Sequence, residues 1–434
     1  MRRSCARPTP PEPRLTNTLP HTTSSRASLL LLLLLCCACK TPNTSSAAPA
    51  ASALCAPAKQ DDPSASLATR SAHTPELRHD ELIERTLSFS SKQHTFRATL
   101  TIPVTAKKNA QLPGVLLLHD WGKPSMLGTS RGSLGVRLPV EVHLYELLAS
   151  ALARQGFAVL RYEKRSCVQD AAPSCTYPRQ ALEPHLDTLA QALLSDAEQA
   201  LETLRQQPEV SPARIAIVGH GQGAELAAAL TRSASHPPSA IVLLSPSTQP
   251  VHRVIAHQID FSLNASRAQL TRQGDDPLAD LLRRQISMLQ DEQQAAKELE
   301  DALGAEKPAI NAAFGLPLAT WKSFAALHAQ AIAALKRKDL PATLTILGAL
   351  DADLPESNPQ ALTDLLRDQS AARQEILGDT THDMIFVEDP PEEEARARGE
   401  EEEEGAASLT PSMHPELAAI IADFLRAALT SAAR

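Results

Sequence analysis

The residues of this chain that could do chemistry lie in three short segments. A glycine-rich turn, Gly-His-Gly-Gln-Gly at 219–223, separates an apolar run from a stretch with helical periodicity. Asp351 and His382 lie further along, each a few residues after another apolar run. A histidine beside a carboxylate is a common general base, because its ordinary pKa lies near neutral pH. The glycine turn could also bind a dinucleotide, since its first and third residues, taken with Ala224, match the spacing of a dinucleotide-binding turn.

Apolar runs that alternate with amphipathic stretches predict the elements that position these residues. Two alternating strands at 84–91 and 95–102, joined by a turn at 91–93, come first. The expected strands that follow are 114–118, 157–162, 214–218, 240–244, 343–347 and 375–377, and the expected helices are 140–154, 186–204, 224–231, 360–368 and 415–428. Such alternation predicts a mostly parallel sheet with helices on both faces, and ligand sites in such sheets lie at the carboxyl ends of the strands.

The alternation stops between about 251 and 334. This segment is helical in pattern and rich in glutamine and charged residues. We interpret it as an inserted helical cap on a single domain that covers residues 76–434, because it interrupts the strand–helix order without starting a new one.

Several segments, in this order, resemble the α/β-hydrolase family, specifically bacterial exported esterases and acyl hydrolases of the dienelactone-hydrolase-like kind. The segments are 115–122 (the oxyanion loop), 156–165 (the fourth strand and its loop), 214–223 (the fifth strand and nucleophile elbow), 347–355 (the acid loop) and 378–382 (the base loop). The resemblance covers about residues 81–428. It implies the α/β-hydrolase fold, a mostly parallel twisted sheet with helices on both faces and an inserted helical cap.

The elbow of this family reads Gly-x-Ser-x-Gly, and the serine is the nucleophile. In this chain the flanking Gly219 and Gly223 and the neighbouring His220 match, but Gly221 holds the nucleophile position. Glycine tolerates the backbone of the turn at no steric cost, yet it has no side chain to attack with.

The resemblance also implies roles for other residues. Asp351 matches the acid, with Asp353 the weaker candidate, and His382 matches the base. The backbone amides of Trp121 and Gln222 match the oxyanion hole. No cofactor is expected, and no spacing of cysteine and histidine indicates a metal site.

A second departure lies in the oxyanion loop, where many relatives have glycine and this chain has Asp120. A carboxylate that points inward there would disfavour an oxyanion. We therefore expect a pseudo-hydrolase that binds a small acyl or ester compound. If Asp351 and His382 keep their geometry, Gly221→Ser is expected to raise esterase activity at least about 100-fold.

Three alternatives remain open. An active hydrolase with a displaced nucleophile would use another serine, and the candidates are Ser125, Ser130, Ser133, Ser245 and Ser247. His382 with Asp351 could instead activate water directly, which is a slow general-base route. The third alternative is a dinucleotide binder, although the glycine turn follows the fifth strand rather than the first and no acidic residue ends the strand after it.

The first 39 residues carry the pattern of an export signal. Arginines precede seven leucines at 29–35, and Ala38 and Cys39 follow. The apolar run is too short to span a bilayer as a mature helix. Because the ending resembles a bacterial lipobox, we expect a lipoprotein anchored to the membrane through Cys39, facing the periplasm or lying at the cell surface. Residues 40–75, rich in Ala, Ser and Pro, are expected to form a disordered tether.

The composition allows a large folded domain and argues against nucleic acid as a partner. Of the 434 residues, 43% are hydrophobic, which is enough for a sizeable core. Aromatic residues make up 3% and the net charge is −8, neither of which is typical of a nucleic-acid binder. The segment 388–405 holds ten acidic residues and two arginines and so accounts for that charge. We interpret it as a solvated acidic loop.

Cysteine usage fits export to an oxidising compartment. Cys167 and Cys175 are eight residues apart in a loop-like stretch. We expect them to form a local disulfide.

The signal predicts export with lipid attached at Cys39. Mass spectrometry of the mature protein is expected to find a lipid-modified N-terminal Cys39. An unmodified N-terminus beyond this residue would contradict the lipid anchor.

Overall fold

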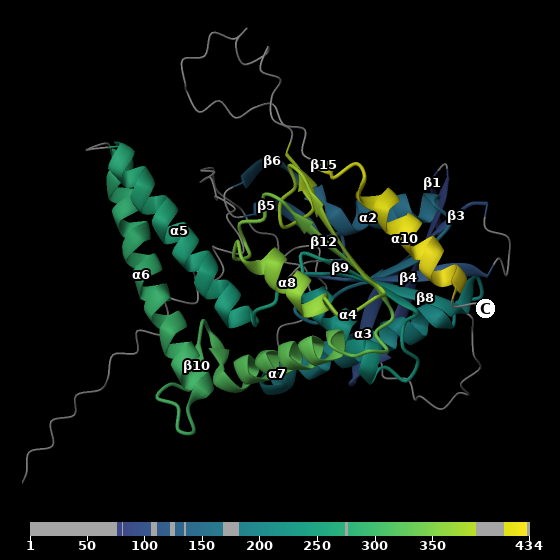
Figure 1. The fold of residues 1–434 in the computed structure, drawn as a ribbon, viewed down its shortest axis with the longest axis horizontal. Helices are drawn as coiled ribbons and strands as arrows, with labels where there is room; N and C mark the ends of the chain where they lie inside the picture. Colours follow the sequence, from purple (N-terminus) through teal and green to yellow (C-terminus); the bar gives the residue numbers. More distant parts are fainter. Residues whose placement is uncertain are drawn as a thin grey trace, which may run out of the picture. The chain divides into compact units, whose positions relative to one another are not determined.

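Nine strands form a central sheet in the spatial order β1-β2-β3-β7-β4-β8-β9-β12-β13 (Figure 1). From β7 onward the neighbours are parallel, whereas β1, β2, β3 and β7 pair with one another antiparallel. The strands are β1 (Glu76–His79), β2 (Leu82–Ser91), β3 (His94–Pro103), β4 (Leu112–Leu118), β7 (Ala158–Tyr162), β8 (Val210–His220), β9 (Ala240–Leu244), β12 (Ala342–Gly348) and β13 (Ala372–Leu377). The predicted fold class, a mostly parallel sheet in an α/β chain, is confirmed.

This computed structural model describes most of the chain from residue 76 onward. The described residues are 76–79, 81–105, 111–121, 126–133, 136–167, 182–273, 277–387 and 412–431, all within the unit Ala50–Arg434. Outside them lie the predicted signal 1–39, the tether 40–75, the acidic loop 388–405 and Cys175. Among the helices of the described part, none has the length and apolar character needed to cross a membrane.

The central strands are apolar because helices cover the sheet on both sides. Every residue of β7 and β9 is buried, as expected for parallel strands packed on two faces. The hairpin of β2 and β3 closes through Lys92 and Gln93, whose φ angles of 44° and 67° are positive. Positive φ at both central residues gives a turn whose twist suits a two-residue hairpin.

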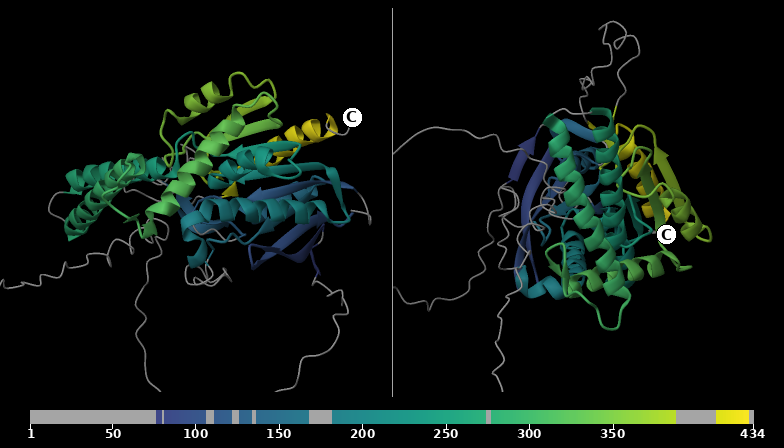
Figure 2. Two further views of the ribbon diagram at one scale, coloured as in Figure 1. Left: turned by 90° about the horizontal axis from the view of Figure 1, so that it is seen from below. Right: turned by 90° about the vertical axis from the view of Figure 1, so that its left-hand side faces the viewer.

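Two helical layers sandwich the sheet (Figures 1 and 2). The helices on one face are α3 (Leu189–Arg205), α4 (Gln222–Ser233), α7 (Leu318–Leu335) and α8 (Asn358–Leu366). The helices on the other face are α2 (Leu144–Arg154) and α10 (Leu417–Ser431). Each layer buries a separate apolar cluster against the sheet, so the carboxyl edge of the parallel strands is held from both sides.

Two predicted helices begin later than expected. Residues 140–143 belong to a strand, β6 (Val136–His143), which pairs with β5 (Thr129–Ser133), because alternating valines there favour an extended chain. Before α3 the chain forms a 3₁₀ helix, η2 (Glu183–Thr188). Two further pairs of strands are too short to be predicted from the periodicity of the sequence. They are β10 (Ala312–Ala313) with β11 (Leu316–Pro317), and β14 (Ile385–Phe386) with β15 (Ser412–Met413).

The segment expected as the cap, 251–334, divides into two parts. Helices α5 (Val251–Gln273) and α6 (Pro277–Gly304) pack side by side (Figure 1) through an apolar cluster of their own, which also contains the fully buried Trp321. Helix α7 instead places Phe324 and Leu327 in the main core against α3 and α4. The cap is therefore α5 and α6, and α7 is part of the layer that covers the sheet.

A buried ion pair joins the loop after β7 to α3. The Arg165 guanidinium donates through Nε and Nη2 to the two carboxylate oxygens of Asp196, at 2.7 and 2.6 Å, and both side chains are 0% exposed. The guanidinium also lies 5.2 Å from the centre of the Phe96 ring in β3. Since burial raises the pKa of Asp196 against the opposing effect of Arg165, this carboxylate depends on its partner to stay charged.

Removing one member of this pair should destabilise the fold. Asp196→Asn leaves a buried guanidinium without its counter-charge and is expected to lower the free energy of unfolding by about 3–5 kcal/mol in urea denaturation. Asp364→Asn, in the exposed pair with Arg367, is the matched control and should cost at most about 1 kcal/mol. An equal loss in the free energy of unfolding for the two variants would show that the buried pair contributes no more stability than the exposed pair.

Candidate active site

The glycine turn between β8 and α4 has the geometry of a nucleophile elbow. Gly221 adopts φ 51° and ψ −112°, a conformation that side chains rarely take. A Cβ on Gly219 would lie 2.1 Å from the carbonyl oxygen of Gly223, so the turn can be this tight only with glycine there. The sequence thus keeps the sharp elbow while residue 221 offers no nucleophilic atom.

Asp351 and His382 meet at the carboxyl edge of the sheet. Asp351 follows β12, His382 follows β13, and Nδ1 of the imidazole lies 2.9 Å from Oδ2 of the carboxylate. The other oxygen of Asp351 accepts the backbone N–H groups of Asp353 and Leu354, at 3.0 and 3.2 Å. Asp353, the weaker candidate for the acid, accepts a bond from Gln258 of α5. The arrangement matches the acid and base roles that the resemblance implies for Asp351 and His382.

The carboxylate of Asp120 occupies the space that a side chain at position 221 would take. A Cβ placed on Gly221 would lie 1.6 Å from Oδ1 of Asp120 and 3.0 Å from Oδ2. The same Oδ1 accepts the backbone N–H groups of Trp121 (2.5 Å) and Gln222 (2.9 Å). These two amides, called the amide cradle below, are the pair predicted to form the oxyanion hole. They converge as expected, but on a carboxylate of the protein itself.

Gln222 is also the first residue of α4, so the positive end of the helix dipole faces the same oxygen.

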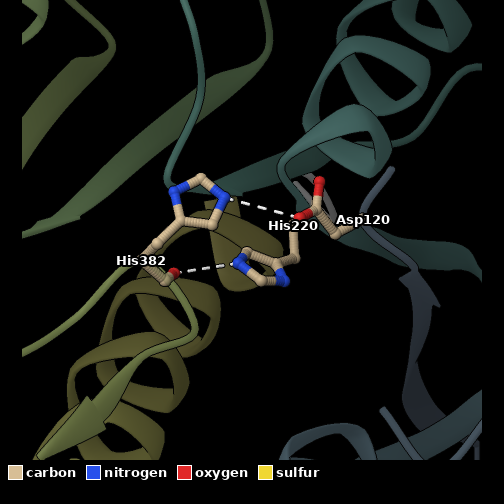
Figure 3. A group of neighbouring side chains, drawn as sticks. All are labelled: Asp120, His220 and His382. Carbon is tan, nitrogen blue, oxygen red and sulfur yellow. Dashed lines mark hydrogen bonds and ion pairs between the residues drawn. The ribbon is translucent and has the colours of Figure 1, made fainter. Parts of the chain in front are cut away.

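His382 lies between two carboxylates. Its Nε2 is 3.4 Å from Oδ2 of Asp120 (Figure 3), and its Nδ1 is 2.9 Å from Oδ2 of Asp351. Burial alone would lower the pKa of His382, but the charge of Asp351 and the hydrogen bond with Asp120 outweigh it and raise this pKa well above 6.5. Burial likewise opposes ionisation of Asp120, yet the hydrogen bond with His382 and the nearby histidine charges hold its pKa below the usual value. Both shifts favour the charged forms of the pair, an imidazolium and a carboxylate.

A chain of hydrogen bonds fixes the distance between the Asp120 and His382 loops. The backbone N–H of Asp120 donates to the Tyr145 hydroxyl at 2.8 Å, and this hydroxyl lies 3.0 Å from Nδ1 of His220. Nε2 of His220 lies 3.0 Å from the backbone carbonyl of His382 (Figure 3). Asp120, His220 and His382 are close enough together to hold a metal ion, but both ring nitrogens of His220 are already engaged. Its role is to position the loops.

Lys164 forms hydrogen bonds that position both amides of the amide cradle. Its side chain is 2% exposed, and Nζ donates to the backbone carbonyl of Asp120 at 2.6 Å and to Oε1 of Gln222 at 2.5 Å. The Asp120 carbonyl and the Trp121 N–H belong to one rigid peptide unit, so this bond orients the first amide of the cradle. Burial lowers the pKa of Lys164 to about 7, against the opposing charges of Asp120 and Glu225. Sequence reasoning missed Lys164, whose only signal was a charge directly after a buried strand.

The other serines considered as nucleophiles have different partners. The Ser245 hydroxyl is buried and donates to the backbone carbonyl of His382 at 2.8 Å. Ser247 donates to the carbonyl of Gln249, and Ser130 donates to Asp383. Ser125 and the side chain of Ser133 lie outside the described residues. The dinucleotide alternative also loses support, because the Gln222 amide at the start of α4 already holds a carboxylate that would repel a pyrophosphate.

Cys167 is buried and disulfide-bonded. Cys175 lies outside the described residues, so the pairing of these two cysteines stays a prediction.

The position of His382 between two carboxylates predicts how its contribution to stability depends on pH. Because its folded-state pKa is raised, the stability that it contributes is fully present below about pH 6.5 and is lost as the pH rises through the folded-state pKa. Nitrogen NMR of labelled histidine should therefore find His382 protonated above pH 7. Asp120→Asn should move its titration to lower pH.

Asp364→Asn is the control for this titration, because it removes an exposed carboxylate whose partner is Arg367. It should change the His382 titration little. A His382 that titrates near pH 6.5 in the wild-type protein, with no response to Asp120→Asn, would contradict the assigned charges.

Comparison with known proteins finds esterases and a lipase among the proteins similar to this chain. The chain is 24% identical over 205 residues to esterase EstD of Thermotoga maritima, a match that spans 46% of this chain and 42% of that protein, less than half of its length. Among solved structures, a lipase in its open form is 16% identical with a TM-score of 0.43, over 80% of this chain and 99% of that one. The esterase Est22 is 15% identical with a TM-score of 0.41, over 70% and 74%. The sequence matches the alpha/beta hydrolase family over residues 115–397, and with well over half of its length matched the chain belongs to that family.

Proposed function

We propose that this esterase-like protein is an exported, lipid-anchored pseudo-hydrolase that has lost ester hydrolysis by a serine nucleophile. The observation that carries the proposal is the Asp120 carboxylate, which fills both the volume of a side chain at 221 and the amide cradle. The export signal and Cys39 support the location.

Three requirements of serine-type hydrolysis are unmet at once. Residue 221 has no hydroxyl to attack with. The two amides that would stabilise a developing oxyanion already hold a charged oxygen, and even one such donor is commonly worth about 100- to 1,000-fold in rate. The carboxylates on both sides of His382 favour its acid form, in which it cannot take a proton from a nucleophile. The last point also weighs against direct activation of water by His382 and Asp351.

The same carboxylate limits what the site can bind. An acyl compound that places its carbonyl oxygen in the amide cradle would have to displace Asp120, and an anionic ligand would meet its charge. Trp121 packs edge-on against Phe324, with ring centres 4.5 Å apart, beside Trp321 at 6.2 Å. We therefore infer that the small acyl or ester ligand suggested by the sequence is uncharged and lies against the half-buried Trp121, outside the cradle.

The structure changes what a serine at position 221 should do. Wild-type protein is expected to hydrolyse 4-nitrophenyl acetate negligibly. Contrary to the expectation from sequence, Gly221→Ser alone should also remain inactive, because its Cβ would fall on the Asp120 carboxylate. Asp120→Gly with Gly221→Ser should exceed either single variant by at least about 100-fold, since the cradle is then empty and His382 faces a hydroxyl.

Two controls complete this series. Asp120→Gly alone opens the cradle without a nucleophile and should stay inactive. Adding His382→Ala to the double variant should abolish the gain. Rapid ester hydrolysis by the wild-type protein, or full activity in Gly221→Ser alone, would overturn the loss of serine chemistry.

A further inference from the structure

A buried carboxyl group lies in the apolar cluster that joins α5 and α6, called the cap seam below. Glu292 of α6 is 7% exposed, and neither of its carboxyl oxygens has a hydrogen-bond partner among the residues that the structure describes. Leu289 and Ala296, three residues before it and four after it, belong to the cap seam. Residues at this spacing share one face of a helix, so Glu292 lies on the face that packs against α5. An ionised carboxylate is costly to bury in such surroundings.

The groups around Glu292 offer no counter-charge to its ionised form. Asp260 of α5 lies at the same level, because Gln293, the next residue of α6, donates to its carboxylate at 2.6 Å. Burial raises the pKa of Glu292, and no neighbouring charge contributes to the shift. The other titratable groups near this level are exposed, or bonded outside the cap in the case of the first: His257 of α5, Asp291 and Lys297 of α6, and Lys322 of α7.

Helix α5 also contacts the acid loop of the candidate active site. Nε2 of His257 lies 3.2 Å from the backbone carbonyl of Ala352. Nε2 of the next residue, Gln258, donates to Oδ1 of Asp353 at 3.2 Å. The backbone N–H of Asp353 in turn donates to the carboxylate of Asp351. The position of α5 in the cap therefore affects how firmly the acid loop is held.

We propose that Glu292 makes the cap a pH-sensitive element that holds or releases the acid loop. When the carboxyl group is neutral, α5 and α6 pack tightly along the cap seam, and α5 keeps its bonds to residues 352 and 353. When the group is charged, the cap seam opens enough to hydrate the carboxylate, and α5 no longer holds the acid loop in one position. The proposal does not depend on which reaction the site performs, so it stands apart from the proposed function.

The direction of the pH dependence follows from the burial of Glu292. Because its folded-state pKa is raised, the stability that the neutral group gives to the packed cap is fully present below about pH 4.5. This stability is lost as the pH rises through the folded-state pKa. Each unit by which the pKa is raised changes the equilibrium between packed and loosened cap about tenfold. The cap is therefore firmest in acid and loosens toward higher pH.

Hydrogen exchange of the full-length protein, followed by mass spectrometry from about pH 4 to about pH 8, tests the proposal. After correction for the intrinsic exchange rate at each pH, protection of peptides from α5 and α6 should fall at least about tenfold as the pH rises. The peptide that contains residues 351–354 should lose protection at the same midpoint. Peptides from the buried strand β9 are the internal reference and should keep their protection.

Glu292→Gln keeps the size of the side chain but cannot ionise, so its cap and acid-loop peptides should stay protected at about pH 8. Glu298→Gln is the matched control, because it makes the same change at an exposed position of α6, where the carboxylate accepts a bond from Gln294. It should behave like the wild-type protein. Wild-type protection that does not change with pH, or a pH dependence that survives Glu292→Gln, would overturn the role of Glu292. Loosening of the cap without loss of protection at residues 351–354 would overturn its link to the acid loop.

Discussion

A side chain at position 221 and the inward carboxylate of Asp120 exclude each other. The 1.6 Å between Oδ1 and the place of a Cβ is far inside any van der Waals contact, so only one of the two groups can occupy the space. The rest of the site follows from which one is present. With Asp120 there, the amide cradle is filled, His382 gains a second negative partner, and the acid form of the histidine is favoured.

The surroundings of Asp120 make this arrangement rigid. Lys164 holds the carbonyl of its peptide unit, and Tyr145 holds its backbone N–H. His220 then ties Tyr145 to the His382 loop, so both sides of the site are set by one continuous series of hydrogen bonds. A buried network of this kind is stable only when each member finds its partner.

Sequence patterns predicted the sheet and most helices because β4, β7, β8, β9 and β12 are apolar runs between clear breaks. The resemblance also located Asp351 and His382, since their loops follow such strands. The inward direction of Asp120 could not be predicted in the same way. It depends on empty volume at Gly221, about a hundred residues away in the chain, and the sequence indicates only that a carboxylate replaces glycine. The burial of Lys164 and the division of residues 251–334 into a cap and α7 could not be predicted either, because both depend on packing between distant segments.

Because a side chain at 221 would overlap the Asp120 carboxylate, residues 120 and 221 can change only in a certain order during evolution. A serine that arises at 221 while Asp120 points inward meets a steric barrier, so that step gives no benefit to select. Loss of the Asp120 side chain must come first, and it gives an empty cradle with no nucleophile. A lineage with this site would have to pass through an intermediate that has neither a serine at 221 nor a carboxylate at 120, which hinders any change to a serine elbow.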